Sequence, residues 1–116
     1  MSSELTLNEY QKQAFSIAMY PEHGTGSVLA LSYTGLGLGE VGEIQGKLKK
    51  IIRDSGGKVS PDKKEAIVAE IGDALWYLSA LSTELGVNLE DVGRKNLDKL
   101  FGRKERGTLQ GSGDNR

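Results

Sequence analysis

Residues 66–81, AIVAEIGDALWYLSAL, are the part of this chain that most restricts how it can fold. As an α-helix, this stretch would be apolar on most of its surface, which is typical of a helix surrounded by neighbours. A chain of 116 residues can bury one modest core and is too short for two. We therefore expect a single domain in which this helix is central.

Helical periodicity is found in four segments: residues 6–20, 29–54, 61–85 and a stretch that begins after residue 88. The first opens with a capping box, Thr6-x-x-Glu9. The third opens with Ser60 as N-cap and Pro61 at the first helical position, and we expect Asn88 to cap the fourth. No alternating run indicates a strand. The sequence thus predicts an all-α, four-helix bundle-like domain over residues 1–103 and a polar, glycine-rich tail over residues 104–116.

Composition excludes several classes of protein. The net charge is −1, so no basic excess favours nucleic-acid binding. The absence of cysteine excludes disulfides, zinc-thiolate sites and thiol nucleophiles. No secretory signal is visible at the start of the chain, and no apolar run is long enough for a membrane span. We expect a cytoplasmic protein without nucleic-acid or membrane partners.

Residues 37–42, GLGEVG, match the G-x-G-x-x-G fingerprint of a dinucleotide-binding turn. Such a turn follows a buried strand, and the preceding residues are too mixed in character to form one. After Gly39 the sequence has helical periodicity, with Val41, Ile44 and Leu48 on one apolar stripe. We therefore interpret the match as accidental. Glycine in a helix costs about 1 kcal/mol relative to alanine, so we expect another helix or a ligand to pack closely there.

Two acidic pairs carry the main functional signal. Glu70 and Asp73 interrupt the apolar third segment three residues apart, and Glu40 and Glu43 have the same spacing in the second. The short connection makes these two helices antiparallel neighbours. Four carboxylates facing one another would repel unless a divalent cation bound among them. Oxygen-only ligands favour Mg²⁺, or Mn²⁺, over zinc.

The acidic pairs could also have no role in metal binding. A single E-x-x-E pair on a helix is usually a solvated face. Lys47 and Lys50 could neutralise Glu43, though less readily the acids of the third segment. A di-iron carboxylate bundle would need histidine ligands, and His23, the one histidine, lies in a predicted loop.

The acidic motifs and their surroundings resemble the MazG-like nucleoside triphosphate pyrophosphohydrolases. The resemblance extends, in order, through YTGLGLGEVGEIQGKLKKIIRD, EIGDALWYLSALSTELG, NLEDVGRKNLDKLFGRKERG and GSGDNR. It implies the all-alpha NTP pyrophosphatase fold and Mg²⁺-dependent hydrolysis between the α and β phosphates of a nucleoside triphosphate. By the same resemblance Glu40, Glu43, Glu70 and Asp73 are the metal ligands. One carboxylate could instead be the general base, and we favour Glu43 over Glu40 and the others.

Substrate-binding residues are expected beside the acids and on the fourth helix. For the phosphates, the candidates are Lys47, Lys50, Asn96, Lys99 and Arg103. For the base and sugar, the candidates are Trp76 and Tyr77, although aromatic residues at this spacing more often belong to a core. The tail, which contains Arg106 and Arg116, could close over the triphosphate.

Three questions are left open by the sequence. The chain could be a non-catalytic helical dimerisation module, or it could act on another pyrophosphate linkage such as that of phosphoribosyl-ATP. The apolar third segment offers more surface than one small bundle can cover, so a homodimer or homotetramer is expected.

Overall fold

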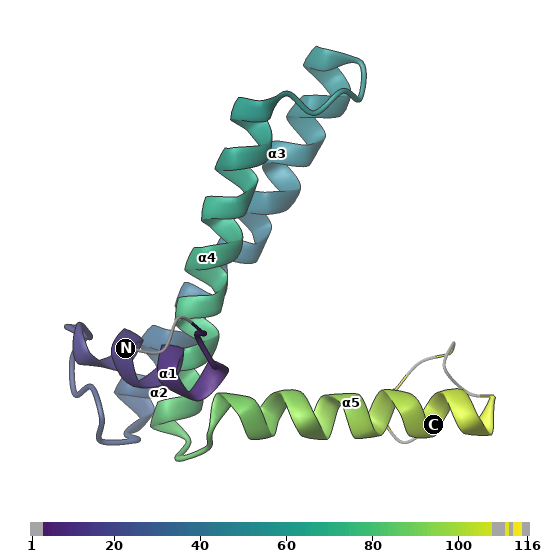
Figure 1. The fold of residues 1–116 in the computed structure, drawn as a ribbon. Helices are drawn as coiled ribbons and strands as arrows, with labels where there is room; N and C mark the ends of the chain where they lie inside the picture. Colours follow the sequence, from purple (N-terminus) through teal and green to yellow (C-terminus); the bar gives the residue numbers. More distant parts are fainter. Residues whose placement is uncertain (1–3, 108–110, 112, 115–116) are drawn as a thin grey trace.

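The computed structural model describes residues 4–107, 111, 113 and 114, except for the side chain of Glu40. Its described residues form α-helices and no strand. Figure 1 shows these helices, which are α1 (Leu7–Ser16), α2 (Val28–Gly37), α3 (Glu40–Ser55), α4 (Pro61–Glu84) and α5 (Leu89–Arg106). The all-α prediction is confirmed.

The predicted helix over residues 29–54 is wrong in being continuous, so the described residues form five helices where four were expected. The chain tightens at Leu38 and Gly39 between α2 and α3. There the Gly39 N–H donates to the Leu36 carbonyl at 2.9 Å and the Val41 N–H donates to the Leu38 carbonyl at 3.1 Å, three residues back in each case. The G-x-G-x-x-G match therefore lies at a helix–helix turn and follows no strand.

Helix α4 is central, as its apolar sequence predicts, because it packs against each of the other four helices. Helix α3 runs antiparallel to it, and the two form a long hairpin (Figure 1). Small side chains are buried along α4, namely Ala74, Ser79, Ala80 and Ser82. They let neighbouring helices approach closely, which suits a helix with several partners.

A buried carboxylate at the end of α4 holds the loop between α1 and α2. Glu84 accepts hydrogen bonds from the Gly24 N–H at 2.6 Å, the Gly26 N–H at 2.9 Å and the Tyr20 hydroxyl. Burial alone would raise the pKa of the Glu84 carboxyl. The three donors and the nearby His23 outweigh burial and hold this pKa below its ordinary value. Glu84 is therefore a charged anchor for the loop.

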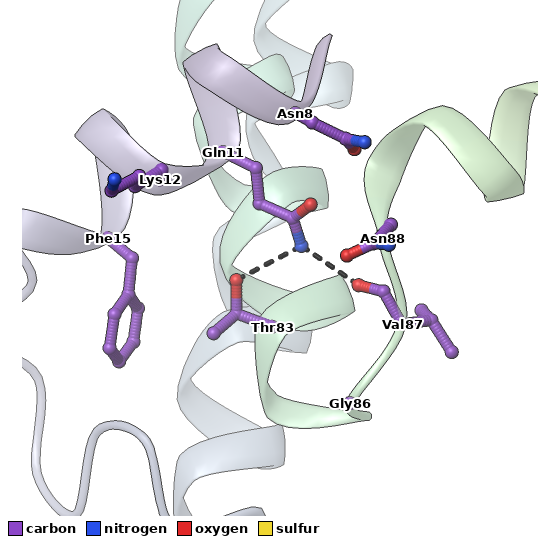
Figure 2. A pocket seen from close by; sticks show the side chains of 8 residues that line it. All are labelled: Asn8, Gln11, Lys12, Phe15, Thr83, Gly86, Val87 and Asn88. Carbon is purple, nitrogen blue, oxygen red and sulfur yellow. Dashed lines mark hydrogen bonds between the residues drawn. The ribbon is translucent and has the colours of Figure 1, made fainter.

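The N-terminus of α5 is capped from α1. The Leu89 N–H donates to Gln11 Oε1 at 2.7 Å, and the Glu90 N–H donates to Asn8 Oδ1 at 3.3 Å. Gln11 Nε2 donates in turn to Thr83 Oγ1 and to the carbonyl of residue 87 (Figure 2). The expectation that the Asn88 side chain caps this helix is wrong: Asn88 takes the N-cap position but makes no capping hydrogen bond. Side chains from α1 satisfy these backbone groups instead.

One glycine of the fingerprint has a clear packing reason. The Tyr77 ring of α4 lies directly against Gly37, where an added Cβ would come within 2.0 Å of a ring carbon. The expectation of close helix packing is thus met at Gly37. At Gly35, Gly42 and Gly46 an added Cβ would meet nothing within 4 Å among the described residues.

The described chain is far more extended than a compact domain. Its radius of gyration is 17.2 Å, against about 13 Å for a compact globule of this length. Helix α5 projects sideways from the base of the hairpin and does not lie alongside α3 and α4 as a bundle helix would (Figure 1). Apolar side chains are left exposed on several helices, for example Leu36, Ile52, Val68, Leu97 and Phe101.

Replacing Glu84 by glutamine should destabilise the protein at pH 7 by about 2–3 kcal/mol, because two loop N–H groups and the Tyr20 hydroxyl lose a charged, buried acceptor. The folded-state pKa of Glu84 is depressed, so its stabilisation is full above the unfolded value of 4.5 and is lost as pH falls through the folded pKa. Urea unfolding at several pH values should show the parent and Glu84→Gln converging in acid. The exposed Glu65→Gln is the control. Equal stabilities of the parent and Glu84→Gln at pH 7 would contradict the role of Glu84 as an anchor.

Gly37→Ala should destabilise the domain by about 1–3 kcal/mol, because its methyl group overlaps the Tyr77 ring. Gly35→Ala, in the same helix with open space, should instead be neutral or stabilising by up to about 1 kcal/mol. Thermal unfolding monitored by circular dichroism compares the two. If both substitutions gave the same shift, the Tyr77 contact would not be the reason for Gly37.

Candidate functional site

The two acidic pairs lie on the two helices of the hairpin, as the sequence predicts. Glu40 begins α3, Glu43 follows in its first turn, and the other pair lies midway along α4. Lys47 Nζ of α3 is 3.8 Å from Glu70 Oε1 of α4, so these two residues lie close together along the hairpin. Glu43 lies one turn before Lys47 on α3, and Asp73 lies one turn after Glu70 on α4. Because the helices are antiparallel, both steps lead in the same direction along the hairpin. Glu43 and Asp73 therefore lie at one height along the hairpin.

Of Glu43, Glu70 and Asp73, Glu70 is the most enclosed. Its side chain is 18% exposed, and its Oε2 atom is buried with no hydrogen-bond donor among the described residues. A carboxylate oxygen removed from water and left without a donor carries a desolvation cost. A cation beside Oε2 would offset that cost. The oxygen-only donor set of this site fits a hard ion such as Mg²⁺.

The other acids are more open. Glu43 and Asp73 are exposed, and the side chain of Glu40 lies outside the described part of the structure. Burial, and secondly the charge of Asp73, raise the pKa of the Tyr10 phenol on α1, so Asp73 lies near that helix. Among the described side chains, no group of three or more acids or histidines is close enough to share a metal ion.

The predicted convergence of carboxylates is thus not present for Glu43, Glu70 and Asp73. Like charges repel, and Glu70 is attracted to Lys47 instead. This pairing also corrects the view that Lys47 neutralises its neighbour Glu43, because Lys47 reaches across to the other helix.

The lysines of α3 border a shallow hollow of about 150 Å³ between α3 and α4. It is lined by Lys47, Lys50, Ile51, Lys63 and Ala66. Lys63, which also donates to the Ser55 hydroxyl, was missed by sequence reasoning. The antiparallel register could have revealed it, since Lys63 near the start of α4 lies opposite the end of α3. The lining surface of this hollow is mostly apolar, and of its lysines Lys47 also pairs with Glu70.

On α5 the candidate residues differ in their surroundings. Asn96, a predicted phosphate-binding residue, is exposed. Lys99 and Arg103 lie one turn apart, and both contact Asp114. The end of α5 that carries them projects away from the α3–α4 hairpin (Figure 1). One chain alone therefore does not bring these cations to the acids. Arg116 lies outside the described residues.

Both aromatic candidates make packing contacts. Tyr77 covers Gly37, and its ring centroid is 5.3 Å from that of Trp76 in an edge-on arrangement. Trp76 meets Tyr20 edge-on at 6.3 Å, and its indole N–H is buried without a hydrogen-bond acceptor among the described residues. These contacts agree with the alternative that Trp76 and Tyr77 belong to the core.

The pocket in Figure 2 is a different place. It lies between α1 and the turn that joins α4 to α5, and Asn8, Gln11 and Asn88 are among its lining residues. None of the described residues that line it carries a carboxylate, and the Gln11 amide already has protein partners. We therefore assign no catalytic role to it. None of the described helices is long and apolar enough to cross a membrane.

Comparison with known proteins identifies the family of the chain. The sequence model of the MazG nucleotide pyrophosphohydrolase domain matches residues 31–108, a range that contains all four acids. The Gene 37 protein of Mycobacterium phage L5 is 47% identical over 109 residues, which cover 92% of this chain and 96% of that protein. No solved structure matches. The family match covers more than half of the chain and spans the acidic hairpin and α5, so the chain belongs to the MazG nucleotide pyrophosphohydrolase family.

Proposed function

We propose that this protein is a Mg²⁺-dependent nucleoside triphosphate pyrophosphohydrolase that releases a nucleoside monophosphate and pyrophosphate. The observation that carries the proposal is the buried Oε2 atom of Glu70, which has no donor among the described residues although it lies between two acid-bearing helices. Membership of the family supports the reaction class. A role in clearing or balancing nucleotide pools follows from this reaction.

The four acids would hold the metal in this proposal: Glu40, Glu43, Glu70 and Asp73. A bound Mg²⁺, or Mn²⁺, supplies neutralisation of phosphate charge and a lowered pKa of bound water. Glu43, which is exposed and open to water, is our candidate general base that accepts the proton of the attacking water. Glu70 is less suited to that role because it is largely enclosed.

Lysines on α3 would hold the phosphates. The Lys47–Glu70 pair is long at 3.8 Å, and the lysine is 38% exposed, so the pair contributes little stability and can exchange for a phosphate oxygen. Lys50 and Lys63 border the same hollow and add positive charge. Their side chains would orient the leaving pyrophosphate.

A homodimer or homotetramer is part of this proposal. The exposed apolar side chains of α2, α3 and α5 and the extended shape leave surface for a second copy to cover. Lys99 and Arg103 lie on the part of α5 that projects away from the hairpin (Figure 1). They would reach the acids of a second chain, so that each site takes residues from two copies.

One observation favours a second candidate function. The described acids do not gather into a metal-binding group, as expected for a helical dimerisation module that does no chemistry. Calorimetric titration separates the two functions. The enzyme binds Mg²⁺ and nucleotide, whereas the module remains an oligomer and binds neither.

Hydrolysis should be tested with Mg²⁺ on a panel of ribo- and deoxyribonucleoside triphosphates and phosphoribosyl-ATP, with products identified by chromatography. The parent should release pyrophosphate from one or more triphosphates, and Glu70→Gln and Asp73→Asn should each lower kcat at least about 100-fold. Glu65→Gln, exposed on the same helix, should remain active. Full activity in both site variants would exclude the metal-site assignment. A preference for phosphoribosyl-ATP would change the proposed substrate and leave the proposed metal site unchanged.

The shared site can be tested by co-expressing two inactive chains, Asp73→Asn and Arg103→Gln. If each site combines acids of one copy with cations of another, each mixed dimer has one intact site. With random pairing, the co-expressed protein as a whole should then show about a quarter of parental activity. Sites complete within one chain would give no restoration. Sedimentation of the parent should show a dimer or larger species, and a monomer that is fully active would contradict this arrangement.

A further inference from the structure

Near the end of α5, a carboxylate from the C-terminal segment binds the two cations expected to hold phosphate. Asp114 Oδ1 accepts hydrogen bonds from Lys99 Nζ and from an Arg103 Nη atom, each at 3.2 Å. The same Arg103 nitrogen donates to the Gly113 carbonyl at 3.3 Å. A single oxygen is thus shared by an ammonium and a guanidinium group, an arrangement also suited to a phosphate oxygen.

Arg103 is not on a solvated face. The residue is 3% exposed, and its Nε atom is buried without a hydrogen-bond acceptor among the described residues. A guanidinium has five N–H donors, and the carboxylate and carbonyl contacts use only part of them. Arg103 therefore has unused donor capacity at the point where Asp114 is bound.

Among the described residues of this cluster, the charges do not balance. Lys99 and Arg103 carry two positive charges, and the carboxylate that they share carries one negative charge. Their hydrogen bonds and charges lower the pKa of the Asp114 carboxyl, so it is ionised at neutral pH. A phosphate group with nearly two negative charges and three acceptor oxygens would satisfy the pair better.

We propose that Asp114 is an internal competitor for phosphate: its carboxylate occupies Lys99 and Arg103, and a polyphosphate must displace it to bind there. This inference rests on the proposed function, since it concerns regulation of the same cations. The Asp114 side chain is 82% exposed, so its ion pairs are weak and screened by water. A weakly held competitor can be displaced, and it lowers apparent affinity only by the fraction of time that it is bound.

Binding of inorganic tripolyphosphate to the full chain, without divalent metal, tests the proposal by calorimetry. Asp114→Asn should bind about three- to tenfold more tightly than the parent, because an amide no longer competes for the cations. Asp91→Asn is the matched control, since it makes the same charge change on α5 about two turns before Lys99 and should bind like the parent. In 0.5 M salt the gain should shrink, as for any exposed ion pair.

A background without the cation pair shows where the gain arises. In Lys99→Gln/Arg103→Gln, tripolyphosphate should bind more weakly, and adding Asp114→Asn should then have no effect. Equal or weaker binding by Asp114→Asn in the parent background would overturn the proposal, because Asp114 would then be inert or would position the cations. The same gain in Asp91→Asn would also overturn it.

The outcome is independent of the hydrolysis assay, because the probe is inorganic and no metal is present. If the parent releases pyrophosphate but Asp114→Asn binds tripolyphosphate no more tightly, only the proposal of an internal competitor is wrong. If Asp114→Asn binds tripolyphosphate more tightly but the parent hydrolyses no nucleotide, only the proposed enzymatic function is wrong.

Discussion

The antiparallel packing of α3 on α4 is the contact on which the candidate site depends. It places an acidic pair from each helix on one hairpin and encloses Glu70 enough to leave one of its oxygens without a donor among the described residues. Because α4 also contacts α1, α2 and α5, the same helix aligns the site and holds the domain together. A substitution that shifts α4 along α3 would therefore change the site and the core together.

Much of this fold could be predicted from local sequence. Apolar periodicity identified α4 as central, and Thr6 and Ser60 do cap α1 and α4 through their side chains. The break at residues 38–39 was missed, because glycine weakens a helix without specifying where it turns. Glu84 and Gln11 were missed for another reason. Their partners lie about 60 to 80 residues away in the sequence, and periodicity contains no information on such contacts.

The candidate site was predicted less completely than the fold. Helix assignment was enough to place one acidic pair on each helix of the hairpin, but side-chain direction decides whether carboxylates meet. That direction depends on competing charges such as Lys47, which pairs across the hairpin with Glu70. The position of α5 was also beyond the sequence pattern: an amphipathic helix packs its apolar face somewhere, and the pattern does not say whether the cover comes from its own chain or another copy.

The capping of α5 by α1 has a consequence for biosynthesis. Gln11 is translated well before its partner, because the backbone N–H that it accepts belongs to Leu89, 78 positions later. Helix α5 can form locally, but it gains its orientation only after most of the chain has been translated. Any assembly of two copies through α5, as proposed above, would therefore have to wait until α1 has docked against the start of that helix.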